Sequence, residues 1–332
     1  MQDIVVPRRI ALPANGPAHG ESVGLFDLLQ AGIDEGVPQA LVTLVEVEGG
    51  ASRAIGTQMA VLADGRYAGY VSGGCVEAAV AAEAIKAIAA GEDTILRFGV
   101  GSPFFDIKLP CGGSIELHVH ACPDPKLVAE VRRRLRERAA FAVEFVPAEG
   151  AAQVIGQVAP GKRTGWRDES FLRCYAPVTR LLLIGRGAEI EQAVRIGTAA
   201  GLDIVALCAD EQSLATAEGL GATALLLTSP RDVPDLPADA WTATVFLFHD
   251  HDWEPVLLAA ALKTDCFLVG AMGSRRAHGQ RRERLLAAGV GQPAIERIRG
   301  PIGLFGPARD AASLAISILA EVTERRIAFD AP

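Results

Sequence analysis

The stretch RLLLIGRGAEIEQAV, residues 180–194, decides the fold of the C-terminal half of this 332-residue chain. It opens with an apolar run typical of a buried strand and closes with apolar residues at helical spacing. Between them, glycines let the chain turn sharply and let a phosphate approach the backbone. The stretch therefore predicts a strand, a tight turn and a helix, which together form the first unit of a doubly wound α/β fold.

The glycine turn fills only part of the dinucleotide-binding pattern G-x-G-x-x-G. Gly185 and Gly187 occupy the first two positions, and Ile190 stands where the third glycine belongs. Asp210 closes the next predicted strand about 25 residues further on, near the place of an acid that binds a ribose. Because any doubly wound fold uses glycine at this turn, the pattern predicts the fold and leaves NAD(P) binding open.

Four more apolar runs follow, at residues 203–210, 222–230, 242–250 and 265–274, with helical stretches between most of them. Strands that alternate with helices predict a parallel sheet with right-handed crossovers. The last run ends in Gly273 and Ser274, followed by Arg275, where open parallel sheets place their ligands. These residues either contact a phosphate or begin a solvated helix face. HDHDW, residues 249–253, is either a ligand cluster or a helix N-cap.

The sequence patterns of the N-terminal half predict a mixed α/β domain. We expect a loose arm over the first twenty residues, and a loop or linker over residues 156–170. Between them the patterns predict helices over 22–35, from about 75, and over 125–138, strands over 40–47 and 115–120, and a hairpin around Asp64-Gly65. We place the N-terminal domain at residues 1–172 and the C-terminal domain at residues 178–332.

One cysteine of the N-terminal half follows a pair of glycines, in YVSGGCVE at residues 70–77. Cys75 lies where a predicted strand gives way to a helix, and the N–H groups and dipole of a helix N-terminus favour an anion. This makes Cys75 a candidate thiolate. Ser72, Gly73 and Gly74 offer backbone N–H donors with little side chain in the way.

A second cysteine precedes a pair of glycines, in LPCGG at residues 109–113. Cys111 lies ahead of Gly112 and Gly113 on a loop that enters a strand. Two such loops from one domain can converge on an anionic, sulfur-reactive or metal-bearing ligand. Equally, both cysteines can be small apolar fillers at tight turns, as free cysteines often are.

Composition narrows the class of protein. Hydrophobic residues make up 50% of the chain and aromatic residues 5%, and the formal net charge is -8. Nucleic-acid binding is not expected, because phosphate backbones attract basic faces. The apolar runs are far shorter than the roughly 18 residues that a membrane span needs, and the start lacks the apolar core of a signal peptide. The six cysteines form no C-x-x-C pair, which favours a reducing, cytoplasmic setting.

Taken together, five segments resemble the XdhC/CoxI family, the maturation factors of xanthine and carbon-monoxide dehydrogenases. YVSGGCVE and LPCGG resemble the signatures of the family's N-terminal domain. FHDHDWEPVLLAAAL, VGAMGSRRAHGQRRERLLAAGV and IRGPIGL resemble its C-terminal Rossmann-like domain. The resemblance covers nearly the whole chain and implies an XdhC/CoxI-like mixed α/β domain followed by a parallel doubly wound domain.

The resemblance implies a chaperone that binds the molybdenum cofactor, a pterin dithiolene carrying molybdenum and phosphate. Such a chaperone holds the cofactor during its sulfuration and inserts it into a xanthine dehydrogenase-type hydroxylase, with a cysteine desulfurase as a further partner. It also implies that Cys75 and Cys111 are the signature cysteines and that Glu77 is the acid after the first. Arg53 is then a phosphate or pterin contact. A homodimer is expected, because a handover protein presents a docking face.

The chain departs from the family pattern at several points. The early G-S-x-P-R loop appears as Gly49-Gly50-Ala51-Ser52-Arg53, where serine replaces proline. The turn at Gly185, the Asp-Pro-Arg expected near Asp210 and the stretch after GPIGL also differ. These last changes cluster where a nucleotide would bind. They therefore argue against dinucleotide binding more than against a cofactor site at the cysteines.

Two other functions compete with the chaperone. A nicotinamide-dependent oxidoreductase would use the C-terminal domain, although the sequence offers no convincing proton donor beyond His249 and His251. A thiol redox or metal-binding scaffold would use Cys75 and Cys111, although three ligands at metal-binding spacing are not found.

Overall fold

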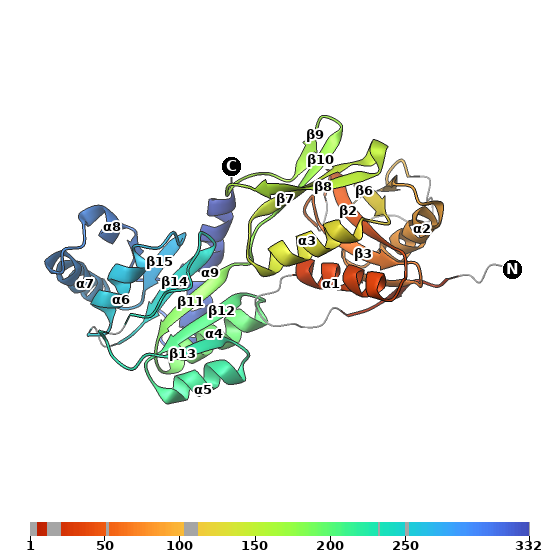
Figure 1. Ribbon diagram of the computed structural model, residues 1–332. Coiled ribbons are helices and arrows are strands. Elements are labelled where there is room, and N and C mark those ends of the chain that lie inside the picture. The colour runs from red at the N-terminus through yellow and green to blue at the C-terminus, as the bar shows by residue number, and fades with distance from the viewer. Residues whose placement is uncertain are drawn as a thin grey trace. The chain divides into compact units, whose positions relative to one another are not determined.

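The computed structural model describes residues 5–11, 21–50, 53–102, 112–231, 233–249 and 252–331. The chain divides into two compact units, one over Glu21–Pro177 together with the N-terminal segment, and one over Val178–Ala331 (Figure 1). Each unit has its own sheets and its own hydrophobic clusters.

The first unit is built on a mixed sheet with the strand order β1-β4-β3-β2-β6-β5. Its central strands are continuous β-branched and apolar runs, as expected for strands buried on both faces. The N-terminal arm contributes a strand that pairs in parallel with β4, whereas we had expected the first twenty residues to be a loose arm. The strands are β1 (Arg8–Arg9), β2 (Gln39–Glu48), β3 (Gln58–Leu62), β4 (Arg66–Gly69), β5 (Thr94–Gly99) and β6 (Ser114–Ala121).

Helices cover both faces of this sheet. The residues of β2 and β3 alternate between two clusters, so Val42 and Met59 pack on α2 (Glu77–Ala90) while Leu41 and Val45 pack with α1 and α3. The predicted hairpin around Asp64-Gly65 is present as β3 and β4. The other two helices are α1 (Glu21–Asp34) and α3 (Pro125–Arg136).

A second sheet, in the order β8-β7-β10-β9, completes the first unit. Its strands are β7 (Phe141–Val146), β8 (Ala151–Gln157), β9 (Gly165–Arg167) and β10 (Ser170–Tyr175), with a short 3-10 helix at Pro147–Glu149. Our expectation of a loop or linker over residues 156–170 was therefore wrong in part, because both ends of that segment lie in strands. Phe141, Phe145 and Phe171 anchor the sheet in the core beneath α1 and α3.

The second unit is a parallel sheet with the strand order β13-β12-β11-β14-β15-β16, which confirms the predicted doubly wound class. The quoted stretch forms β11, the turn and α4, as predicted. The strands are β11 (Arg180–Gly185), β12 (Asp203–Cys208), β13 (Thr223–Leu226), β14 (Thr242–Leu247), β15 (Leu268–Ala271) and β16 (Ile298–Arg299).

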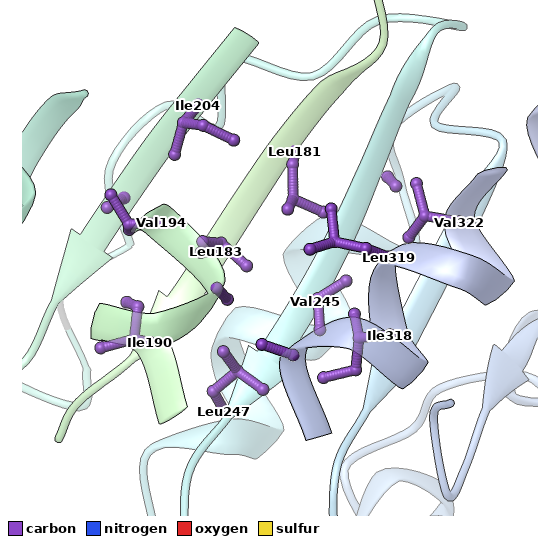
Figure 2. Packing of buried hydrophobic residues seen from close by; sticks show 14 of the residues in the cluster. Leu181, Leu183, Ile190, Val194, Ile204, Val245, Leu247, Ile318, Leu319 and Val322 are labelled. Carbon is purple, nitrogen blue, oxygen red and sulfur yellow. The ribbon is translucent and has the colours of Figure 1, made fainter. Parts of the chain in front are cut away.

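The helices of the second unit cover the two faces of its sheet. On one face, Leu181, Leu183 and Val245 pack against α4, α5 and α9, and Figure 2 shows this cluster from close by. On the other face, α6, α7 and α8 pack over a second cluster. The helices are α4 (Ala188–Ala199), α5 (Glu211–Gly219), α6 (Glu254–Ala261), α7 (Arg275–Ala287), α8 (Gln292–Glu296) and α9 (Ala311–Asp330). Within the described ranges, no helix is both long and apolar enough to span a bilayer.

Candidate functional site

The loops that the sequence singled out in the first unit leave its mixed sheet at one end. β2 and β4 end there, at Glu48 and Gly69, while β3 and β6 begin there, at Gln58 and Ser114. The register agrees, because Glu48 pairs with Ser114 and Gly69 lies opposite Met59 on β3. The loops after β2, after β4 and before β6 therefore share one edge of the sheet.

The loop between β4 and α2 is held from the inside by Glu77. One carboxylate oxygen, Oε1, accepts hydrogen bonds from the backbone N–H groups of Val71 at 3.0 Å, Ser72 at 2.8 Å and Gly73 at 3.1 Å. The other, Oε2, accepts from the N–H of Val76 at 3.2 Å, and the Ser72 hydroxyl donates as well. Glu77 is only 3% exposed. The carboxylate thus satisfies three amides of the loop and that of the α2 N-cap, Val76.

These contacts keep Glu77 charged. Burial by itself disfavours the charged form, but the backbone N–H groups that point at the carboxylate hold the pKa of Glu77 below its usual value. The N–H groups of Ser72 and Gly73, which the sequence suggested as donors to a ligand, donate to Glu77 in this structure. A contact from these two groups to a bound ligand remains a prediction that requires Glu77 to give them up.

Cys75 lies exposed on this loop, two residues before α2 begins at Glu77. Gly73 and Gly74 have φ angles of 103° and 112°, which side-chain-bearing residues rarely adopt, and both glycines are exposed beside the thiol. Among the described cysteines, Cys122 is the other exposed one. Burial raises the pKa of the Cys208 thiol to about 12, as expected of a cysteine that fills a core.

The second glycine pair lies against the end of β2. A Cβ on Gly113 would sit 2.3 Å from the carbonyl oxygen of Glu48, and a Cβ on Gly49 would sit 3.3 Å from Cα of Gly113. Only glycine allows the loop after β2 and the loop before β6 to approach this closely. Gly112 has a φ of 70°. Cys111 lies outside the described residues.

Two arginines lie near the ring of a tyrosine at the start of the Cys75 loop. The guanidinium carbon of Arg9 lies 4.0 Å from the centre of the Tyr70 ring, and that of Arg53 lies 5.6 Å from it. A Cβ on Gly74 would lie 4.0 Å from Cε1 of the same ring. Arg53 was predicted from the sequence, whereas Arg9 and Tyr70 were not. The tyrosine just before the glycine loop was an available signal, whereas the position of Arg9 depends on the pairing of β1.

A buried carboxylate with two histidines lies elsewhere in the first unit. Oδ2 of Asp93 is 2.8 Å from Nε2 of His118 and 2.9 Å from Nδ1 of His120, and its Oδ1 accepts from the N–H of Ala121. The three side chains could hold a metal ion, since their ligand atoms lie within 4.8 Å of one another. However, 2.8–2.9 Å is hydrogen-bond spacing, and the buried Nδ1 of His118 has no partner to orient it as metal-bound histidines usually require.

In the second unit, several residues that were predicted to bind a nucleotide form hydrogen bonds within the protein. Gly187, with a φ of 81°, caps α4, and its N–H donates to the Ser213 hydroxyl at 2.9 Å. That hydroxyl in turn donates to Asp210, which caps α5. Gly185 allows β11 to approach β14, because a Cβ there would lie 2.4 Å from the carbonyl oxygen of Leu247. Contacts from these residues to a dinucleotide remain a prediction.

A pocket of about 930 Å³ lies in the second unit where β14, β15 and β16 end. Gly273, Ser274 and Arg275 line it. Ser274 is the N-cap of α7, and its hydroxyl accepts from the N–H of Ala277. His249 reaches Glu189 at 3.1 Å across the same pocket. His251 lies outside the described residues.

The fold and the site define a class of protein with two units: an α/β domain that presents a cysteine on a carboxylate-anchored glycine loop, followed by a Rossmann domain. Residues 181–322 match the model of the XdhC Rossmann domain, and residues 33–99 match that of the XdhC and CoxI family. The chain belongs to the XdhC and CoxI family, as its sequence segments indicated. The family match over residues 33–99 includes Arg53, Cys75 and Glu77.

Two known proteins are similar over most of the chain. The molybdenum cofactor insertion chaperone PaoD of Escherichia coli (strain K12) is 38% identical over 287 residues, which cover 86% of this chain and 83% of PaoD. A crystal structure described as a xanthine dehydrogenase from Bacillus halodurans superposes with a TM-score of 0.70 at 20% identity, over 91% of this chain and 96% of that one. The second likeness supports the fold.

Proposed function

We propose that this chain is a molybdenum cofactor-binding chaperone, which protects the sulfurated cofactor and inserts it into a xanthine dehydrogenase-type hydroxylase. The observation that carries the proposal is the 38% identity, over 86% of the chain, to a protein named as a molybdenum cofactor insertion chaperone. A cysteine desulfurase that supplies the sulfur and a homodimer belong to the same proposal.

The proposed binding site lies at the shared edge of the mixed sheet. Cys75 faces solvent on a loop whose shape Glu77 fixes, so its sulfur is available to a metal centre without rearrangement of the core. Arg53 adds a positive charge on the same edge. The residues proposed to contact or support the cofactor are Arg53, Ser72, Gly73, Gly74, Cys75, Glu77, Cys111, Gly112 and Gly113.

Purification without oxygen from cells that make the cofactor tests the proposal. We expect molybdenum and pterin to copurify with the wild-type chain in near-equal amounts. We expect Cys75→Ala and the double variant Cys75→Ala, Cys111→Ala to lose most of both. Cys122→Ala is the matched control, because Cys122 is also exposed but is not on the shared loop edge.

Two outcomes would refute the chaperone. One is a wild-type chain that carries no cofactor after purification and takes up none on reconstitution. The other is a double variant that binds as much cofactor as the wild type. Transfer of bound cofactor to a purified apo-hydroxylase, measured as recovered hydroxylase activity, tests the insertion step separately.

A second candidate function is NAD(P)-dependent oxidoreduction by the second unit. The pocket at the carboxyl ends of β14 and β15 lies where open parallel sheets bind their ligands. If that ligand is NAD(P)H, saturating amounts will raise the melting temperature by mass action, and Gly187→Val will abolish the rise. An unchanged melting temperature in the wild type removes this candidate.

A further inference from the structure

The shared loop edge carries a cation–aromatic cluster, formed by Arg9, Tyr70 and Arg53. Arg9 stacks closely on the Tyr70 ring, at 4.0 Å from its centre, and Arg53 lies further out at 5.6 Å. A guanidinium 4.0 Å from a ring centre lies within the range of a cation–π contact, which holds a flexible side chain in place. The Tyr70 ring thus lies near two positive charges, which come from segments far apart in the sequence.

The sheet fixes the position of Arg9. β1 pairs in parallel with β4, and hydrogen bonds of 2.8 Å on either side of Arg9 join Arg8 to Gly65 and Ile10 to Tyr67. Because successive side chains of a strand point to opposite faces, Arg9 shares the face of its partner Tyr67, and Arg8 points to the other. Both Arg9 and Glu77 act electrostatically on Tyr67, which agrees with this placement.

Among the described residues, no ion pair neutralises the charges of the cluster. In the part of the chain that the structure describes, neither Arg9 nor Arg53 has an acidic partner. The nearby carboxylate of Glu77 is buried and saturated by backbone N–H groups and the Ser72 hydroxyl. A stacked guanidinium engages the ring with its face and keeps the N–H donors at its edge available. Two such groups near one ring offer N–H donors that suit an oxyanion, and a phosphate above all.

We infer that Arg9 and Arg53, gathered by Tyr70, form the phosphate-binding part of the cofactor site on the Cys75 loop. The inference rests on the proposed function, and it adds Arg9 and Tyr70 to the binding residues. Tyr70 joins the cluster to the loop, because its ring comes within 4.0 Å of the position that a Cβ on Gly74, next to Cys75, would take. The phosphate end of the ligand binds the arginines, and the metal end is left to the cysteine.

Affinity measurements on matched variants test this assignment. Arg9→Gln and Arg53→Gln should each raise the Kd for the cofactor roughly tenfold or more, the change expected when a charged hydrogen-bonding group is lost. Arg8→Gln removes the same charge one residue away on the opposite face and should leave the Kd unchanged. Arg9→Lys should recover part of the affinity, because it keeps the charge and loses the planar fork.

A second readout separates phosphate binding from folding. The salt dependence of the Kd should become shallower in Arg9→Gln and Arg53→Gln, as fewer phosphate charges are contacted, while the melting temperature stays at the wild-type value. Variants that bind like Arg8→Gln, or a salt dependence that does not change, would overturn the inference.

Inorganic phosphate serves as a probe that does not depend on the cofactor. It should protect the wild-type chain and Arg8→Gln against thermal unfolding more than it protects Arg9→Gln and Arg53→Gln. If the wild type fails to bind the cofactor but shows this difference, the proposed function is wrong and the phosphate site stands. Equal protection of all four proteins overturns the phosphate site, whatever the cofactor does.

Discussion

At the scale of single residues, two buried carboxylates organise the first unit in different ways. Glu77 collects backbone N–H groups from a loop, and Asp93 collects two histidines and one N–H group from β6. Burial alone penalises the ionised form of Asp93, but the hydrogen bonds from His118 and His120 hold its pKa well below the usual range. Each carboxylate is therefore stabilised as an anion by the folded state.

This pKa shift makes stability depend on pH. Because the pKa of Asp93 is lower in the folded than in the unfolded chain, its contribution is complete above about pH 5 and is lost as the pH falls through and below the usual aspartate range. We expect Asp93→Asn to lower the free energy of unfolding by about 2–4 kcal/mol at neutral pH. Between about pH 5 and pH 3, the free energy of unfolding should also fall less in this variant than in the wild type.

Denaturant unfolding at a series of pH values measures both effects. Glu92→Gln is the control, because Glu92 is the exposed neighbour of Asp93 and its removal should leave the pH profile close to that of the wild type. Parallel pH profiles for Asp93→Asn and the wild type would contradict the role given to Asp93.

At the scale of elements, close backbone contacts bring the site loops together. The loop before β6 reaches the end of β2 at Gly113, where any side chain would meet the carbonyl oxygen of Glu48. Arg97 of β5 reinforces the same corner through ion pairs with Glu48 and Glu116. The position of the loop before β6 thus depends on the absence of a side chain at Gly113 as much as on the ion pairs of Arg97.

We expect Gly113→Ala to push the loop away from β2 and to lower the free energy of unfolding by about 1–3 kcal/mol, as overpacking does. Its backbone φ lies outside the left-handed region, so the effect reports on close approach alone. Gly156→Ala on β8 is the matched control, because nothing lies within 4 Å of the added Cβ. Equal melting temperatures for the two variants would show that the loop adapts freely.

Several elements could be predicted from the sequence, and the failures have physical reasons. Glycine spacing identified the turn after β11 and the loop of Cys75, because special backbone angles require specific residues. β8 and β9 were missed because they are mostly exposed strands, so their side chains show no strong apolar alternation. β16 has only two residues, Ile298 and Arg299, too few for any period.

The candidate site, too, could be predicted only in part from the sequence. The sequence marked Cys75, Arg53 and Glu77 as candidate site residues, because they match the pattern of the family that it resembles. It did not reveal that Glu77 binds the N–H groups of Ser72 and Gly73, since a carboxylate at a helix start can face a ligand or its own loop equally well. Nor did it place Arg9, whose role depends on pairing between segments more than fifty residues apart.

At the scale of the whole molecule, each unit has a self-sufficient core. The buried clusters of the first unit lie within residues 10–175 and those of the second within residues 181–322. A separate core of this size is what allows a domain to fold by itself. The second unit also matches a family model of its own.

We therefore expect residues 178–332, produced alone, to fold into a soluble monomeric or self-associated domain with mixed α/β circular dichroism and one cooperative thermal transition. The isolated segment should not bind the cofactor, because the proposed cysteine and arginine residues lie in the first unit. A fragment without a cooperative transition would show that the second unit needs the first to fold.

The internal anchoring of the Cys75 loop has a thermodynamic consequence. A flexible glycine-rich loop becomes ordered when it binds a ligand, and the loss of chain entropy then lowers the binding affinity. Here Glu77 already holds the backbone N–H groups of Val71, Ser72 and Gly73, so part of that entropy is lost before any ligand arrives. A cofactor that binds this loop through the Cys75 thiol, as proposed, would therefore lose less affinity to backbone ordering than one that binds an unanchored loop.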